Sequence, residues 1–183
     1  TVAATDRHVP TWDGELYLEY HRGTYTSQAR NKKNNRKTEL KLREAEWLAS
    51  EAAVKTGDFS SYPAKDFHEA WKIALRNQFH DIIPGSSIHE VYEDSTEEYR
   101  KANEILDAIE KNALKVLTRD AASTVTVVNN SSFAGEGIVT VKGFEDKEGS
   151  WLSADGKELP AVRTENGWLV KVSGVEPTGF TTL

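Results

Sequence analysis

The feature that most constrains the fold is a stretch of 30 or so residues, 88–117, in which mostly apolar residues recur at helical spacing. A side chain returns to the same face of an α-helix after three or four residues, so this spacing gathers the residues into one stripe. The stripe consists of Ile88, Val91, Tyr92, Ser95, Tyr99, Ala102, Ile105, Leu106, Ile109, Ala113, Val116 and Leu117. The pattern predicts a long amphipathic helix that starts with a Ser87–Glu90 capping box and continues to about Asp120.

Two other segments show the same spacing. Residues 26–56 predict a helix that ends at Gly57 and has a stripe formed by Leu40, Ala45, Trp47, Leu48, Ala52 and Val54. Residues 66–83 predict a shorter helix, with Asp66 and Glu69 as its capping box and Phe67 and Trp71 in its core. Three amphipathic helices joined by short connections predict an up-down-up bundle over residues 28–121.

The pattern changes at Ala122, where β-branched residues begin to alternate with polar ones. Strands are predicted at residues 123–129, 138–141, 151–152, 161–163 and 167–172, and another opens at 178–183. Glycine and asparagine separate these segments, as is typical of turns. The predicted fold class is therefore α+β: a three-helix up-down-up bundle followed by a small, all-β, sandwich-like domain over residues 122–183.

Composition excludes several classes of function. The net charge of −6 argues against general binding to nucleic acid, and the basic residues in the first half of the helix at 26–56 are read as a solvated face. No apolar run reaches the roughly 18 residues that a membrane span needs, so no membrane partner is expected. Because cysteine is absent, disulfides and thiolate metal sites are excluded, and a cytoplasmic location is expected.

Two places in the sequence offer side chains for chemistry. His80 and Asp81 stand side by side just before the helix-stopping pair Pro84-Gly85, and imidazole and carboxylate are both zinc ligands. A surface or capping pair is the alternative interpretation. In residues 15–21 apolar and polar residues alternate, which predicts a strand with Glu15 and Glu19 on its polar face. These two glutamates are either catalytic or ligand groups, or side chains that only face solvent.

Three blocks of sequence, in this order, resemble the α-mannosidases of glycoside hydrolase family 38, on the bacterial and cytosolic-vacuolar branch. They are WDGELYLEYHRGTYTSQ at 12–28, NKKNNRKTELKLREAE at 31–46 and NQFHDIIPGSS at 77–87. Weaker family markers are VNNSSF at 128–133 and PTGF at 177–180. The resemblance implies that residues 1–27 are the terminal piece of a preceding, barrel-like catalytic domain, and that the active site is shared between that domain and the bundle.

The resemblance also implies roles for individual residues. His80 is implied to be a ligand of one zinc ion whose other ligands belong to the missing catalytic domain, and Asp81 is implied to contact substrate hydroxyls. Glu19, or else Glu15, is the candidate general acid, while the catalytic nucleophile lies outside this segment. The implied function is that of the central segment of a zinc-dependent retaining α-mannosidase, acting on terminal α-linked mannose in oligosaccharides or small mannosides. The alternative is a non-catalytic module that binds glycan or protein; a homo-oligomer is left open.

The isolated 183-residue chain is therefore predicted not to hydrolyse α-mannosides, because the nucleophile and most metal ligands are expected in the preceding domain. Release of the aryl group from an aryl α-mannoside, with zinc added, measures this. Turnover by the isolated chain would contradict a site shared with a missing domain.

Overall fold

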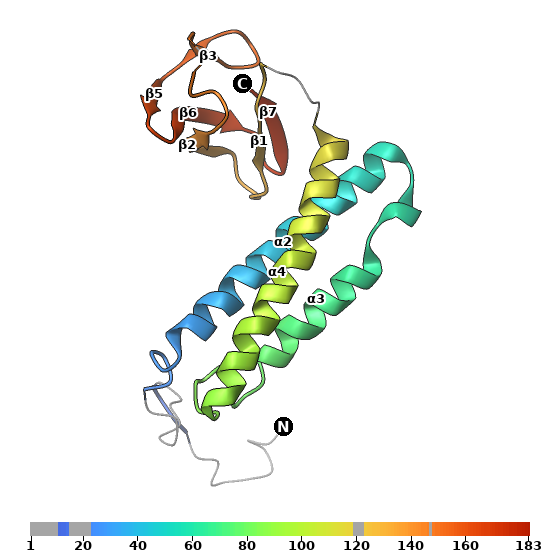
Figure 1. The fold of residues 1–183 in the computed structure, drawn as a ribbon, viewed down its shortest axis with the longest axis vertical. Helices are drawn as coiled ribbons and strands as arrows, with labels where there is room; N and C mark the ends of the chain where they lie inside the picture. Colours follow the sequence, from blue (N-terminus) through green and yellow to red (C-terminus); the bar gives the residue numbers. More distant parts are fainter. Residues whose placement is uncertain (1–10, 15–22, 119–122, 147) are drawn as a thin grey trace.

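A computed structural model describes residues 11–14, 23–118, 123–146 and 148–183. Its first part consists of three helices: α2 (Ala29–Thr56), α3 (Ala64–Asn77) and α4 (His89–Leu117), with a short 3-10 turn, η2 (Phe59–Ser61), before α3. The chain ascends α2, descends α3 and ascends α4 in the view of Figure 1. The predicted up-down-up bundle is confirmed. No helix in the described part of the chain is both long enough and apolar enough to span a membrane.

The helix ends follow the sequence signals only in part. Gly57 ends α2 as predicted, in the left-handed conformation (φ 68°) that glycine adopts without steric cost. The predicted capping boxes are wrong. Helix α3 begins directly after Pro63, so Asp66 lies within its first turn, and α4 begins after Ile88 with no hydrogen bond from a capping side chain. Helix α3 also ends at Asn77 instead of near Ile83.

The core of the bundle lies where the three helices meet. Its central cluster consists of Leu42, Ala45, Ala49, Phe67, Ala70, Ala74, Leu106 and Ile109. Leu40 and Val54, predicted to belong to the stripe, are 50% and 63% exposed. The inward face of α2 instead passes through Leu42, Leu48 and a series of alanines.

The second part of the chain is built from short antiparallel strands. They are β1 (Thr126–Asn129), β2 (Gly135–Val141), β3 (Trp151–Leu152), β4 (Glu158–Leu159), β5 (Ala161–Thr164), β6 (Gly167–Val175) and β7 (Gly179–Thr182). Strand β1 pairs with β7, β6 lies between β2 and β5, and β3 pairs with β4. The predicted strands are present with shifted bounds, and β4 was not predicted. A bundle followed by a small β domain is therefore the observed fold.

The β part packs on the upper end of the bundle, the end at which α2 and α4 finish (Figure 1). The rings of Trp47 and Phe180 stack with centroids 5.4 Å apart and an interplanar angle of 19°. Val128 of β1 packs against a second cluster that includes Leu48 and Ala113. The connection between α3 and α4 therefore lies at the opposite, lower end of the bundle.

The burial pattern of α2 predicts opposite outcomes for two leucines that are two residues apart. Leu42 is fully buried, so Leu42→Ala is expected to lower the free energy of unfolding by about 2–5 kcal/mol. Leu40→Ala, at the half-exposed position, is expected to change it by no more than about 0.5 kcal/mol. Chemical denaturation followed by far-ultraviolet circular dichroism measures both. Equal losses would show that the inward face of α2 has been assigned wrongly.

One carboxylate in the bundle is poorly solvated. The Glu110 side chain on α4 faces α2, is only 19% exposed, and lies 3.9 Å from the Lys41 ammonium. Its Oε1 atom has no hydrogen-bond partner among the described residues. Burial raises the pKa of Glu110 to about 7; Lys41 opposes this rise, and the carboxylates of Glu44 and Asp107 add to it. The folded bundle therefore disfavours the ionised form of Glu110.

This carboxylate predicts a pH dependence of stability. Because the pKa is raised from 4.5 to about 7 on folding, its contribution is fully present below pH 4.5 and is lost as the pH rises through about 7. Glu110→Gln is therefore expected to be more stable than the wild type at pH 8, by on the order of 1 kcal/mol after allowance for solvent screening. The gain should vanish toward pH 4.5. Thermal unfolding at several pH values measures it, with exposed Glu104→Gln as the control that should show no gain.

Candidate functional site

His80 and Asp81 lie in a tight turn immediately after α3. The amide groups of Ile82 and Ile83 both donate to the carbonyl oxygen of Phe79, at 2.8 and 3.0 Å. This places His80 and Asp81 at the two central positions of the turn, where side chains point away from the backbone. The two side chains are 78% and 53% exposed, and His80 Nε2 lies 3.7 Å from Asp81 Oδ2. The turn thus presents an imidazole and a carboxylate together, at the lower end of the bundle.

Polar side chains from the first turn of α2 hold the backbone that follows. Asn31 Nδ2 donates to the carbonyl oxygen of Ile82 at 3.3 Å, and Asn31 Oδ1 accepts the hydroxyl of buried Ser95 at 2.6 Å. Lys32 Nζ donates to the carbonyl oxygen of Pro84 at 3.2 Å. Burial at this position lowers the pKa of the Lys32 ammonium. The loop is therefore tied to α2 at two successive places.

The start of α4 reaches the same loop from the other side. The Tyr92 hydroxyl accepts the amide of Ser87 at 3.0 Å and lies 3.4 Å from the carbonyl oxygen of Asp81 and 3.3 Å from that of Ile82. Ser87 Oγ donates to the Asp81 carbonyl at 2.6 Å. Two hydroxyl groups thus converge on the peptide oxygen of Asp81.

Gly85 allows the loop to lie directly against the chain that leads into α2. Its φ of 93° is disfavoured for residues with a Cβ, and an added Cβ would lie 2.7 Å from the carbonyl oxygen of Ser27. The Pro84-Gly85 pair, predicted from sequence as a helix stop, therefore also serves a close backbone contact.

Asn77 and Gln78 at the end of α3 form side-chain hydrogen bonds that were not predicted, although Gln78 was placed on the stripe of the second helix by its spacing. Asn77, 1% exposed, donates to Glu98 Oε2 at 2.7 Å, and Gln78 Nε2 donates to Asn35 Oδ1 at 3.0 Å and Glu39 Oε1 at 2.9 Å. A signal for this polar layer was available in the sequence. Polar residues continue the inward stripe of α2 toward its start, at Asn31, Asn35 and Thr38.

The other predicted site residues have a different outcome. Glu15 and Glu19 lie outside the described residues, so the role of Glu19 as general acid stays a prediction. Within the described ranges, no group of three or more histidine, aspartate or glutamate side chains gathers as a metal site would require. His80 and Asp81 therefore offer two donors of types that suit zinc, and a metal ion bound by them would need further ligands from outside the described residues.

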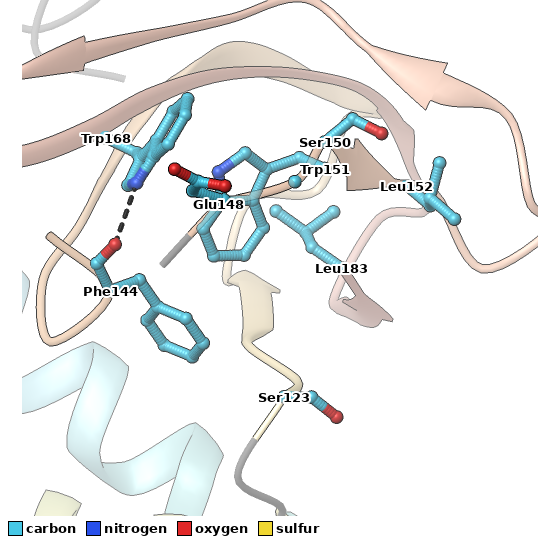
Figure 2. Close-up of a pocket in the computed structure, with 9 residues that line it drawn as sticks. Ser123, Phe144, Glu148, Ser150, Trp151, Leu152, Trp168 and Leu183 are labelled. Atoms are coloured by element: carbon cyan, nitrogen blue, oxygen red, sulfur yellow. Dashed lines mark hydrogen bonds between the residues drawn. The ribbon is translucent and has the colours of Figure 1, made fainter. Parts of the chain in front are cut away.

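A cavity of about 320 Å³ lies in the β part of the chain. The β part lies at the end of the bundle opposite the connection between α3 and α4 (Figure 1). Its walls include Phe144, Trp151, Trp168 and Leu183, and Figure 2 shows the indole of Trp168 donating to the carbonyl oxygen of Phe144, at 2.9 Å. Trp151 and Leu183 are less than 10% exposed and belong to the core cluster of the β part. The cavity therefore lies beside the core of the β part, with Ser123, Glu148 and Ser150 also in its wall, and it includes no residue of the turn.

Comparisons with known proteins identify relatives of the bundle. The family described as the alpha mannosidase middle domain matches residues 19–117. An alpha-mannosidase of Saccharomyces cerevisiae is 52% identical over 84 residues, which are 46% of this chain and 8% of the yeast protein. Alpha-mannosidase 2C1 of Mus musculus is 46% identical over 89 residues, which are 49% of this chain and 8% of the mouse protein. The chain thus matches less than a tenth of the length of these relatives.

Solved structures share the fold of almost the whole chain. A glycosyl hydrolase family 38 protein from Enterococcus faecalis covers 99% of this chain and 27% of its own, with a TM-score of 0.71 and 21% identity. An alpha-mannosidase from Enterococcus faecalis V583 covers 87% of this chain and 24% of its own, with a TM-score of 0.66 and 21% identity. Since the middle-domain family matches more than half of the residues, the chain belongs to the alpha mannosidase middle-domain family, and the resemblance to glycoside hydrolase family 38 seen in the three sequence blocks is confirmed.

Proposed function

We propose that this chain is the central segment of a zinc-dependent, retaining α-mannosidase that hydrolyses terminal α-linked mannose in oligosaccharides or small mannosides. The observation that carries the proposal is the turn after α3, where an exposed imidazole and an exposed carboxylate lie 3.7 Å apart on a backbone held from two sides. Membership of the α-mannosidase family supports the choice of substrate class.

The donor set of the turn fits a zinc ion that is shared with another part of the protein. A neutral histidine nitrogen and carboxylate oxygens are ordinary zinc ligands, and a catalytic zinc keeps positions open for substrate. His80 is the proposed ligand, since its ring is largely exposed and can meet donors from outside the bundle. When bound, such a metal supplies a Lewis acid for vicinal sugar hydroxyls.

Asp81 is the proposed contact to the substrate. Its carboxylate is half-exposed, next to the imidazole, and can accept hydrogen bonds from sugar hydroxyls. A retaining glycosidase also needs two carboxyl groups about 5–5.5 Å apart, as nucleophile and as acid. We place the nucleophile in the preceding catalytic domain, to which residues 1–27 belong as its terminal piece, and keep Glu19 as the candidate acid.

The lower end of the bundle also carries the apolar surface that a neighbouring domain requires. Leu75, Phe79 and Ile88 are 57%, 51% and 68% exposed. Leu75 lies in the last turn of α3, Phe79 begins the turn that follows, and Ile88 directly precedes α4. Exposed apolar side chains grouped beside a polar site are typical of an interface. We propose that this end packs against the preceding catalytic domain of the same chain. The cytoplasmic location and the question of a homo-oligomer stay predictions.

The test compares two histidines in the complete enzyme. His80→Ala is expected to lose the bound zinc, about one per chain in the wild type, together with more than about 100-fold of the aryl-mannosidase activity. His89→Ala is the matched control, because its side chain is 79% exposed at the same end of the bundle and is paired only to Glu93 among the described residues. Elemental analysis and steady-state kinetics measure both properties.

Zinc and activity retained by the His80 variant would overturn the proposed metal site and favour the non-catalytic binding module. Equal losses in both variants would also contradict it, since they would reflect general damage to this end of the bundle.

A further inference from the structure

The turn that presents His80 and Asp81 is held through its backbone, not through these two side chains. In the described part of the chain, their polar contact is with each other, at 3.7 Å, and the His80 ring also packs on Phe79 with centroids 4.1 Å apart. No helix contributes a side-chain hydrogen bond to either group within the described residues. The direction of both side chains therefore depends on how firmly the peptide groups around them are fixed.

One side chain contacts three of those peptide groups. The Tyr92 hydroxyl accepts from the Ser87 amide and lies within hydrogen-bond distance of the carbonyl oxygens of Asp81 and Ile82. A phenolic hydroxyl has a single proton to donate, so it alternates between or shares the two carbonyls while it accepts from the amide. It thereby joins the start of the loop, at Asp81, to its end, at Ser87.

Tyr92 is itself rigidly placed. It lies in the first turn of α4, is only 6% exposed, and belongs to the inward stripe of that helix. The ring is buried and its side chain has only two torsion angles, so the position of α4 largely determines where the hydroxyl lies. The position of the Tyr92 hydroxyl therefore constrains the peptide groups of the turn that it contacts.

We propose that Tyr92 is a positioning residue for the metal site: through the peptide groups of Asp81, Ile82 and Ser87, its hydroxyl sets the direction in which His80 and Asp81 are presented. This inference rests on the proposed function, since it assigns Tyr92 a part in holding the ligand turn. Nothing in it requires Tyr92 to touch the metal or the substrate.

The bundle offers a matched control for this role. Tyr99 lies two helical turns further along the same face of α4 and is 2% exposed. Its hydroxyl donates to Asn35 Oδ1 at 3.3 Å, an oxygen that also accepts Gln78 Nε2, and forms no hydrogen bond of its own with the described residues 79–88. Tyr92→Phe and Tyr99→Phe therefore remove the same kind of buried hydroxyl from the same helix, but only the first removes hydrogen bonds made directly to the turn and the loop after it.

The experiment uses the complete enzyme and measures the zinc dissociation constant and the rate of zinc release to a chelator. Tyr92→Phe is expected to raise the dissociation constant about tenfold, the lower end of the range for loss of a partner behind a metal ligand. Tyr99→Phe is expected to leave it unchanged, although both variants lower the unfolding temperature. In the kinetics, Tyr92→Phe should raise KM as well as lower kcat, because the direction of Asp81 changes with that of His80.

A second substitution keeps the inference testable if Tyr92→Phe fails to fold. Ser87→Ala removes the other hydroxyl on the Asp81 carbonyl, at 2.6 Å, from a position outside the helix. Ser87→Ala is also expected to raise the zinc dissociation constant.

The outcomes separate this inference from the function on which it rests. If His80→Ala loses zinc while Tyr92→Phe and Ser87→Ala bind it as tightly as Tyr99→Phe does, the positioning role is overturned and the metal site stands. If His80→Ala keeps its zinc, both the metal site and the positioning role are overturned.

Discussion

The close approach of three helices is the constraint on which the rest of the molecule depends. An alanine side chain ends at Cβ, so helices that meet across alanines lie near one another, and polar side chains of one helix can reach the backbone beside another. Eight of the buried hydrophobic residues are alanines, distributed over all three helices: Ala45, Ala49, Ala52, Ala53, Ala70, Ala74, Ala102 and Ala113. Larger residues at these positions would be expected to push the helices apart.

The two ends of the bundle differ in chemistry. Toward the upper end the stripe is apolar, and it continues into the β part through the stacked rings of Trp47 and Phe180. Toward the lower end the inward positions become polar, with Asn31, Asn77 and Ser95 all buried and hydrogen-bonded. The apolar upper end packs against the β part, and the polar lower end holds the loop after α3 by hydrogen bonds. The same three helices therefore carry the β part at one end and the turn with His80 and Asp81 at the other.

Sequence periodicity predicted the features that local physics determines. The three helices, their order and the change to β structure follow from the spacing of apolar residues. His80 and Asp81 were expected in the last turn of the second helix, but α3 ends at Asn77 and the two residues lie in the turn that follows it. Where the prediction failed, the cause lay in contacts between distant segments. Leu40 was assigned to the inward stripe by its apolar character and helical spacing, although Leu42 is the residue that is buried in the core cluster. Likewise Tyr92 was recognised as part of a stripe, but the partners of its hydroxyl depend on how α4 meets the loop, which no local pattern encodes.

The hydrogen bonds to the loop after α3 have one more consequence, which concerns conformational entropy. A flexible loop that becomes ordered only when a ligand arrives loses backbone freedom at that moment, and this loss weakens binding. Here the carbonyl oxygens of Asp81, Ile82 and Pro84 are already occupied by donors from within the chain. The backbone freedom is therefore given up during folding, when the burial of the helix faces compensates for it. A ligand at this turn meets a preorganised surface and has only the two exposed side chains left to order.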